Sequence, residues 1–191
     1  MKYFIIDPLS PYKIHYHIGM VSRRLTDSGG LVLTAQGVNY SKTEEVLDDG
    51  IRLFKIMMRL EFALKDIGFC TPGRRQVAEV HWERYVNERL GLAFWEKIKD
   101  AADAEPLIET PPMKQIADNY GNLHWRKSGA VSSIQELIAA MRRVRNNLFH
   151  GGKSGDPDAD RNAMLYLAAL FVIDQILQED EGLRTSFSGI Y

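Results

Sequence analysis

A basic segment that starts at Arg142 combines the residue types used in phosphate chemistry. From Arg142 to Lys153 the chain has three arginines, one lysine and no acidic residue, which is a formal charge of +4 with His150 neutral. The other 179 residues together carry −5. Such a concentration of positive charge at one helix end is typical of a phosphate-binding surface. Arg142, Arg143 and Lys153 are therefore candidate residues for binding phosphate or RNA.

Arg145 occupies an unusual place in this segment. It follows Met141 by four residues and precedes Leu148 by three, so it borders the apolar stripe of a predicted helix. A guanidinium beside apolar groups is costly to bury unless an anion or good acceptors meet it. Glu61 flanks the apolar face of an earlier predicted helix, four residues before Lys65, and is a candidate partner.

His150 follows Arg145 by five residues, which in a continuous helix would separate the two side chains by about 140°. The pair Gly151 and Gly152 predicts that the helix ends near Phe149, so the imidazole can turn back toward Arg145. An arginine clamps a phosphate and stabilises developing negative charge, while a histidine moves a proton near neutral pH. Together they suit the cleavage of a phosphodiester.

The elements that would position these residues are mainly helical. Apolar residues at spacings of three and four predict helices that begin at a capping box (Ser41–Glu44) and at Gln76, Leu92 and Ser133, and a final one in which Asp156 is the N-cap. The final helix, ending near Gln178, is apolar nearly all round between Met164 and Ile173, which predicts burial by the bundle or by a second subunit. We therefore expect an all-α bundle of four to five main helices over residues 41–191.

Two regions fall outside this helical pattern. Residues 1–40 predict an irregular or partly β arm, with β-prone stretches at 14–18 and 31–34. Residues from about 100 to 130 contain three prolines and two glycines and predict an irregular insertion held to the body by Leu123 and Trp125. Trp82 and Trp95 are likewise expected to be packing anchors.

Composition excludes several classes of protein. The 191 residues are 45% hydrophobic with a net charge of −1, which argues against a disordered chain. The single cysteine, Cys70, excludes an internal disulfide and a cysteine-based zinc site, and it fits the reducing cytoplasm. The most apolar stretch, Met164–Ile173, has ten residues, too few to span a membrane. His15 and His17 lack further ligand types nearby, so we expect no metal site and no cofactor.

The segment from Arg143 to Lys153 resembles the Arg-x4–6-His signature of the HEPN superfamily, with Asn146 directly after the arginine. It is most similar to a bacterial and plasmid-borne branch that also has an Arg-x-Glu-x-Ala-Leu-Lys helix, here residues 59–65. That branch shows a Pro-Pro-x-x-Gln turn as well, here residues 111–115, followed by a tryptophan such as Trp125. The likeness covers roughly residues 45–178 and leaves out residues 1–40.

The resemblance implies an all-α HEPN-like bundle and a metal-independent endoribonuclease that works as a homodimer, with the motifs of both subunits facing one cleft. In such enzymes the 2′-hydroxyl of the RNA attacks the adjacent phosphorus and leaves a 2′,3′-cyclic phosphate. Arg145 would stabilise the charge, His150 would be the general acid or base, and Asn146 would orient the phosphate or the histidine. Glu61 and Lys65 would support them.

HEPN ribonucleases occur in toxin–antitoxin, abortive-infection and CRISPR systems, so the resemblance also implies a cytoplasmic defence or stress effector, with an antitoxin or inhibitor as a possible partner. Two alternatives stay open. Some HEPN proteins bind RNA, a nucleotide or a protein without cleaving RNA, and a helical bundle of this size can also be an interaction module that joins a larger complex through its final helix.

Overall fold

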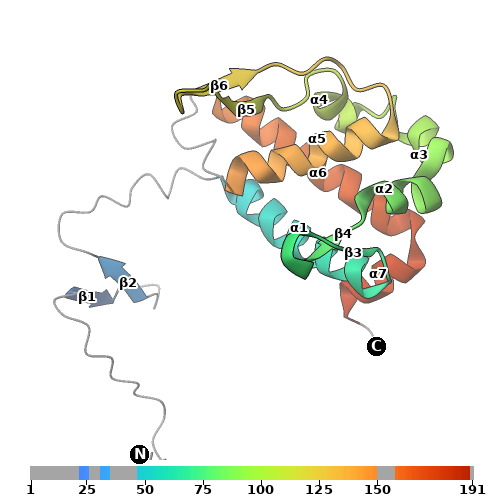
Figure 1. Ribbon diagram of the computed structural model, residues 1–191, viewed down its shortest axis with the longest axis horizontal. Helices are drawn as coiled ribbons and strands as arrows, with labels where there is room; N and C mark the ends of the chain where they lie inside the picture. Colours follow the sequence, from blue (N-terminus) through green and yellow to red (C-terminus); the bar gives the residue numbers. More distant parts are fainter. Residues whose placement is uncertain (1–21, 26–30, 35–46, 150–157, 190–191) are drawn as a thin grey trace, which may run out of the picture. The chain divides into compact units, whose positions relative to one another are not determined.

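The computed structural model describes residues 22–25, 31–34, 47–149 and 158–189 (Figure 1). The chain divides into two compact units, residues 1–40 and 41–191. In the first unit, β1 (Ser22–Leu25) pairs antiparallel with β2 (Leu31–Thr34), and Leu25 lies opposite Leu31. The β-prone stretch predicted at 31–34 is confirmed, whereas the one at 14–18 lies outside the described residues.

The second unit is mainly helical, as the sequence predicts, with two β-hairpins. Its helices are α1 (Asp48–Asp66), η2 (Arg74–Gln76), α2 (Trp82–Tyr85), η3 (Val86–Leu90), α3 (Gly91–Ile98), η4 (Ala102–Ala104), α4 (Glu105–Ile108), α5 (Ile134–Phe149), α6 (Ala159–Glu179) and α7 (Glu181–Ser188). The hairpins pair β3 (Cys70–Pro72) with β4 (Ala78–Val80) and β5 (Lys114–Ala117) with β6 (Leu123–Arg126).

The core forms where α1, α5 and α6 pack on one another, with α7 added against α1 and α6 and with α4 against α5 and α6 (Figure 1). The apolar stripe of α1, with spacings of three and four, is fully buried at Leu53, Met57, Leu60 and Leu64. Asp48 and Asp49 lie in the first turn of α1 and Lys65 in its last, where each charge complements the helix dipole. The capping box predicted at Ser41–Glu44 lies outside the described residues.

The start of α5 confirms the predicted capping signal. The Ser133 hydroxyl accepts a hydrogen bond from the Glu136 amide, and the Glu136 carboxylate accepts from the amide and hydroxyl of Ser132. These contacts satisfy amides that the first turn of a helix leaves free. The cap therefore fixes where α5 begins and so which of its side chains face each neighbour.

The helix predicted from Gln76 is wrong over its first residues, which form η2 and the hairpin strand β4. Arg75 and Gln76 both adopt left-handed backbone angles, with φ of 58° and 64°, and these turn the chain back on itself. A Cβ at Gly73 would overlap the Glu79 carboxylate, the end of an exposed side chain that would have to move aside. The helix begins at Trp82, after the His81 ring accepts a hydrogen bond from the Arg84 amide.

The insertion predicted as irregular contains the short helix α4 and the β5–β6 hairpin. Its turn is held by the Asp118 carboxylate, which accepts hydrogen bonds from the amides of Tyr120 and Asn122 and from the Asn122 side chain, at 2.8–2.9 Å. Leu123 and Trp125 do not fasten it to the body, because their side chains are 67% and 41% exposed. The buried Leu107 and Ile108 of α4, together with polar side chains from α5 and α6, fasten it instead.

The final helix begins at Ala159, with Asp158 as its N-cap in place of the predicted Asp156. It is buried mainly by its own bundle, and only part of its surface, including Met164 and Leu167, is exposed. The further helix α7 was not predicted from the sequence. It is tied to α1 by Arg59, which donates to the Ser186 and Phe187 carbonyls, and by the Ser186 hydroxyl, which donates to Asp66.

Candidate active site

Arg145 lies on α5 and faces Glu61 of α1, the acidic partner that the sequence suggested. The Arg145 Nη2 atom donates to the Glu61 carboxylate, and Nη1 donates to the Asn146 side chain at 3.0 Å. The side chains of Arg145 and Glu61 are 24% and 26% exposed. The guanidinium is therefore held in a fixed orientation from two sides, but part of it can still be reached by a ligand.

Arg142 lies one turn earlier on α5 and stacks on the buried ring of Trp82, with the guanidinium carbon 5.2 Å from the ring centre. No acceptor for a hydrogen bond from Arg142 is present among the described residues. Burial lowers the pKa of Arg142 from its ordinary value; the Glu61 charge opposes this shift and the Arg145 charge adds to it. An arginine stays charged at neutral pH, so an anion placed here would be stabilised by Arg142.

A pocket of about 240 Å³ connects these side chains. Its lining comes from α1, the β3–β4 hairpin, α2 and α5, and consists of Glu61, Lys65, Ala78, Glu79, Val80, Trp82, Arg142 and Arg145. Three cations and two carboxylates meet here, although they come from parts of the chain up to 84 residues apart. The structure thus brings together four of the predicted site residues, Glu61, Lys65, Arg142 and Arg145.

Arg143 and Asn147 lie on another side of α5 and hold the insertion. Arg143 donates to the Pro112 carbonyl at 3.0 Å and to the Ser128 hydroxyl at 2.8 Å, and the buried Asn147 donates to the Met113 carbonyl at 3.0 Å. Arg161 of α6 donates to the carbonyls of Thr110 and Pro111. Arg143 was predicted to bind phosphate or RNA, but its donors are directed at these structural acceptors and it does not line the pocket.

His150 and Lys153, two further predicted site residues, lie outside the described residues. Asn146, predicted to orient the phosphate or the histidine, accepts a hydrogen bond from Arg145 and so helps to position the guanidinium. Within the described ranges no cluster of three or more histidine, cysteine or acidic residues could hold a metal ion. In the same ranges, none of the helices has the length and hydropathy that crossing a bilayer demands.

Sequence reasoning missed the contribution of Trp82 and of the β3–β4 hairpin to the pocket. Trp82 is a packing anchor, as expected, but its ring also carries Arg142. The hairpin supplies Ala78, Glu79 and Val80 to the pocket wall. No local spacing could reveal these contacts, since they join residues about sixty positions apart.

Comparisons with protein-family models, with curated proteins and with solved structures give no match for this chain.

Proposed function

We propose that this protein is a metal-independent endoribonuclease of the HEPN type that acts as a homodimer. The observation that carries the proposal is the half-buried Arg145, held by Glu61 and Asn146 at the edge of a pocket that also contains Arg142 and Lys65. An oriented guanidinium in a partly dry site stabilises developing negative charge better than one in water. The Arg-x4-His spacing resembles that of the HEPN ribonucleases.

The proposed reaction needs one proton acceptor, one proton donor and stabilisation of the phosphorane-like transition state. The 2′-oxygen of one nucleotide attacks the adjacent phosphorus and loses its proton, while the bond from phosphorus to the 5′-oxygen breaks and that oxygen gains a proton. His150 serves as the general acid or base in this exchange. Arg145 stabilises the charge on the non-bridging oxygens, with Arg142 and Lys65 as further cations. The products carry a 2′,3′-cyclic phosphate and a 5′-hydroxyl.

Exposed apolar side chains beside Arg145 support the homodimer. Met58 and Phe62 of α1 lie within one helical turn of Glu61, and Phe149 of α5, which stacks on Phe54 of α1, lies one turn beyond Arg145. Burying this surface against a second copy would bring two Arg145 side chains to a shared cleft. We therefore assign the interface to α1 and the end of α5. On α6, the large apolar side chains of Met164 and Leu167 are exposed as well.

Sedimentation of two charge-introducing variants separates these surfaces. Met58→Glu should shift the protein toward monomer and lower cleavage, because a charge cannot be buried unpaired in an apolar interface. Leu167→Glu, which changes an equally exposed apolar residue on α6, is the matched control. Dissociation by Leu167→Glu alone would move the interface to α6, and a monomeric wild-type protein would contradict the homodimer.

The nuclease activity is tested by incubating RNA with the protein in EDTA. We expect cleavage by the wild-type protein and its loss in Arg145→Ala and in His150→Ala. Arg184→Ala is a suitable control, because Arg184 is an exposed arginine on α7. Cleavage that persists in both site variants would contradict the assignment.

Binding of RNA or a nucleotide without cleavage is the second candidate function. The Arg142 guanidinium favours it, because this group packs on Trp82 and has no hydrogen-bond acceptor among the described residues. Such a protein would bind RNA with an affinity that falls steeply as salt rises and would leave the RNA intact. The same assay in EDTA, combined with a binding measurement, distinguishes it from the nuclease. We also propose a defence role with an antitoxin partner, which is based on the resemblance to HEPN proteins. Expression of the wild-type protein should then be toxic to the cell, and His150→Ala should remove the toxicity.

A further inference from the structure

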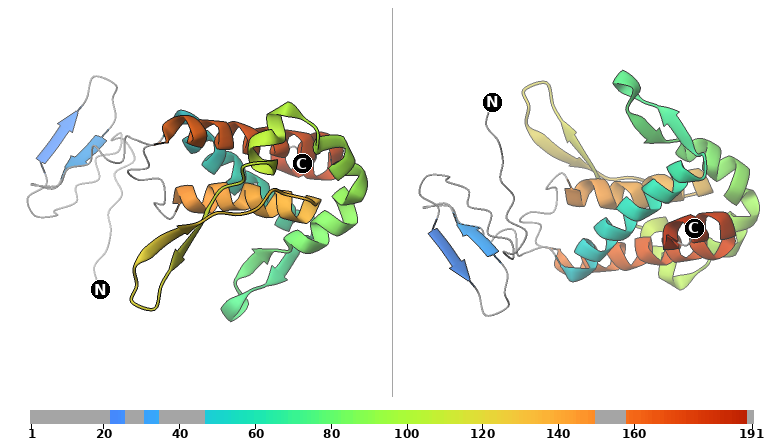
Figure 2. Two further views of the ribbon diagram at one scale, coloured as in Figure 1. Left: turned by 90° about the horizontal axis from the view of Figure 1, so that it is seen from above. Right: turned by 90° about the horizontal axis from the view of Figure 1, so that it is seen from below.

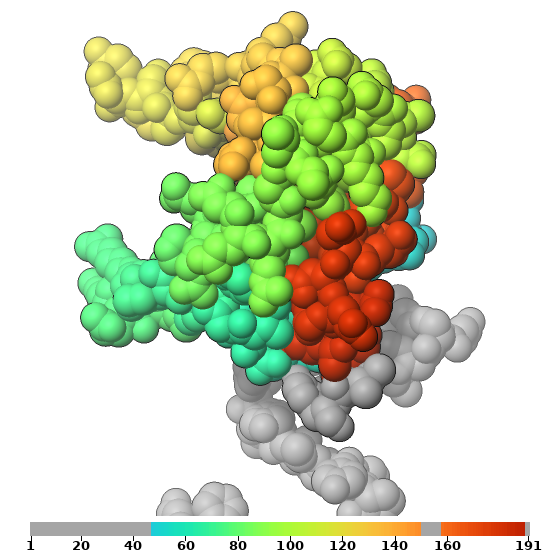
Figure 3. Space-filling model, turned by 90° about the vertical axis from the view of Figure 1, so that its right-hand side faces the viewer, coloured from blue at the N-terminus to red at the C-terminus, as the bar shows by residue number. Residues whose placement is uncertain are grey.

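The β5–β6 hairpin projects from the helical body as a sheet of two strands (Figure 2). In the space-filling view it reaches beyond the helices that carry it (Figure 3). Strand β5 packs against α5, whereas all four residues of β6 are exposed. Along its outer edge, the backbone amides and carbonyls of β6 pair with no other described strand. Such an edge is able to accept a further strand.

One face of this hairpin is apolar and uncovered. The register pairs Ala117 with Leu123 and Gln115 with Trp125, and side chains of directly paired residues lie on the same face of a sheet. Leu123 is 67% exposed and Trp125 is 41% exposed. A hairpin of two strands is marginally stable in water unless a further strand or another element packs on it. Among the described residues, nothing covers this face.

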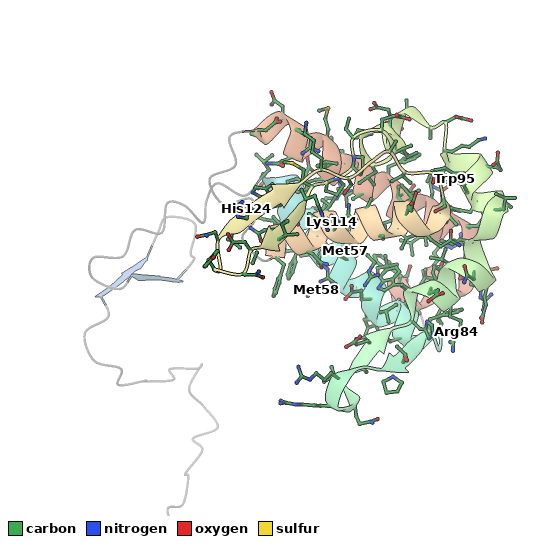
Figure 4. The ribbon with its side chains drawn as sticks, turned by 45° about the horizontal axis from the view of Figure 1, so that its top comes forward. Met57, Met58, Arg84, Trp95, Lys114 and His124 are labelled. Carbon is green, nitrogen blue, oxygen red and sulfur yellow. The ribbon has the colours of Figure 1, made fainter. Side chains whose placement is uncertain are left out.

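The opposite face is basic. It carries Lys114, which is paired directly with Arg126, and also His124, which is paired with Ile116 (Figure 4). Like charges in directly opposed positions destabilise a pair of strands. The single acidic side chain of the hairpin, Asp118, is bound to the turn and to His124. Within the described part of the chain, neither Lys114 nor Arg126 forms an ion pair.

The open edge and the two faces together specify what would fit beside β6. Side chains of an added strand alternate between the two faces of the sheet. Every second residue would therefore lie beside Leu123 and Trp125, and the residues between them would lie beside His124 and Arg126. Apolar side chains suit the first set of positions and carboxylates suit the second. A carboxylate beside Arg126 would also offset its repulsion by Lys114.

Three other occupants fit this surface less well. A second copy of the chain that paired antiparallel through β6 would place basic face beside basic face, where like charges repel. A nucleic acid would neutralise the basic face, but it has no peptide backbone to pair with the strand edge. The parts of this chain outside the described residues hold no stretch in which acidic and apolar residues alternate, and residues 1–21 contain one acidic residue.

We propose that β6 binds an extended segment of a partner protein in which acidic and apolar residues alternate. The segment adds to the hairpin as a third strand, its apolar side chains cover Leu123 and Trp125, and its carboxylates lie beside Arg126. None of the hairpin residues lines the pocket that contains Arg145. The inference therefore goes beyond the proposed nuclease activity and does not depend on it.

The test uses a synthetic peptide in which glutamate and valine alternate, because valine favours strands. The peptide is titrated into the full-length protein labelled with nitrogen-15, and amide resonances are followed by NMR. We expect saturable shifts for β6 and none for the β3–β4 hairpin. A peptide with the same glutamates and valines in two separate blocks should bind far more weakly. Equal binding of the two peptides would overturn the inference.

Substitutions on both faces of β6 test the contacts. Arg126→Glu should weaken binding of the glutamate peptide about tenfold, since an attraction becomes a repulsion. This variant should still fold, because it places an opposite charge across from Lys114, and it should gain affinity for a peptide that alternates lysine and valine. Trp125→Ser should weaken binding about tenfold or more.

Arg74→Glu is the matched control, because Arg74 is an exposed arginine on the other projecting hairpin. It should bind the glutamate peptide like the wild-type protein. Wild-type affinity in both Arg126→Glu and Trp125→Ser would overturn the inference, as would an equal loss in Arg74→Glu.

Two N-methylated peptides test whether binding uses the strand edge. One is methylated on the amide nitrogens of its glutamates and the other on those of its valines. Because the amides of successive residues point to opposite edges of a strand, only one of these sets faces β6. One methylated peptide should therefore bind like the parent, and the other should not bind. Equal behaviour of the two would overturn the addition of a strand.

Two further outcomes would assign the surface to another occupant and overturn the inference. Shifts of the β6 amides with protein concentration alone, without peptide binding, would assign it to a second copy of the chain. Shifts with single-stranded RNA but not with the glutamate peptide would assign it to a nucleic acid. RNA cleavage in EDTA tests the nuclease separately, so peptide binding by a protein that leaves RNA intact would uphold this site and remove only the proposed function.

Discussion

Arg142 and Arg143 are neighbours in the chain, yet α5 directs them to different surroundings. Arg143 donates to Pro112 and Ser128 and fastens the insertion. Arg142 rests on Trp82 inside the pocket, close to the pair formed by Arg145 and Glu61. Successive residues of a helix point about 100° apart. The basic residues of α5 are therefore divided between a side that holds the insertion and a side that lines the pocket. The formal charge of the segment therefore overstates the charge available to a ligand.

The largest expected difference between the two sides is in activity. Arg145→Ala should slow RNA cleavage by about 10²–10³-fold, the effect of removing one donor that stabilises charge in a transition state. Arg143→Ala should slow it by less than about tenfold, since Arg143 does not line the pocket. Single-turnover kinetics with saturating protein measure both rates. Equal losses in the two variants would contradict the division of α5.

Stability should reverse this order. Arg143→Ala removes two hydrogen bonds to the insertion, and we expect it to lower the free energy of unfolding by about 1–3 kcal/mol. Asn147→Ala, which removes the bond to the Met113 carbonyl, should have a similar effect. Both variants should also expose the insertion to proteases. Urea unfolding and limited proteolysis measure these effects, with Arg184→Ala on α7 as the control. An unchanged proteolysis pattern would argue against this role of Arg143.

Arg142 should contribute to binding more than to chemistry. Arg142→Gln removes a charge that would meet a phosphate, and we expect the Michaelis constant for RNA to rise about tenfold, the value of one charge-assisted hydrogen bond. The turnover number should change far less. Steady-state kinetics separate the two parameters. A fall in the turnover number alone would place Arg142 in the chemical step.

The smallest effect concerns the turn of the β5–β6 hairpin. Hydrogen bonds from Asn122 hold the pKa of the Asp118 carboxyl at about 2, against an ordinary value of 3.8. A lowered pKa in the folded state stabilises the turn above pH 3.8, and this contribution is lost as pH falls toward 2. Amide resonances of Tyr120 and Asn122 should shift with a midpoint near pH 2, the pKa of Asp118 in the folded protein, while those of α5 do not. Asp118→Asn should abolish the shift, and a transition near pH 4 would contradict the low pKa.

The long helices of this protein could be predicted from the sequence because their signals are local. The stripe of α1, the capping serines of α5 and the extent of α6 each depend on residues within one or two turns. The β3–β4 hairpin escaped prediction because Val77, Val80 and Tyr85 also fit a helical spacing. The turn uses left-handed backbone angles at Arg75 and Gln76. Neither residue is glycine, so the sequence does not indicate a turn at these positions. Helical periodicity therefore cannot separate a short helix from a hairpin followed by a helix.

The candidate site was predictable only in part, for a similar reason. The position of Arg145 beside an apolar stripe predicted an acidic partner. Glu61 is that partner, because α1 and α5 pack together. That Arg143 would be used for structure depended on where the Pro112 carbonyl and the Ser128 hydroxyl lie, which follows from the tertiary fold. The pocket wall from β4 depended on the unpredicted hairpin. The positive charge of the segment did not indicate which of its arginines would be available to bind a ligand.

The central claim is tested most directly by identifying the ends of RNA products formed in EDTA. The account predicts cleavage by the wild-type protein that leaves 2′,3′-cyclic phosphate and 5′-hydroxyl ends, and cleavage slowed about 10²–10³-fold in Arg145→Ala purified in the same way. Intact RNA with the wild-type protein, or products that carry 3′-hydroxyl and 5′-phosphate ends, would contradict it.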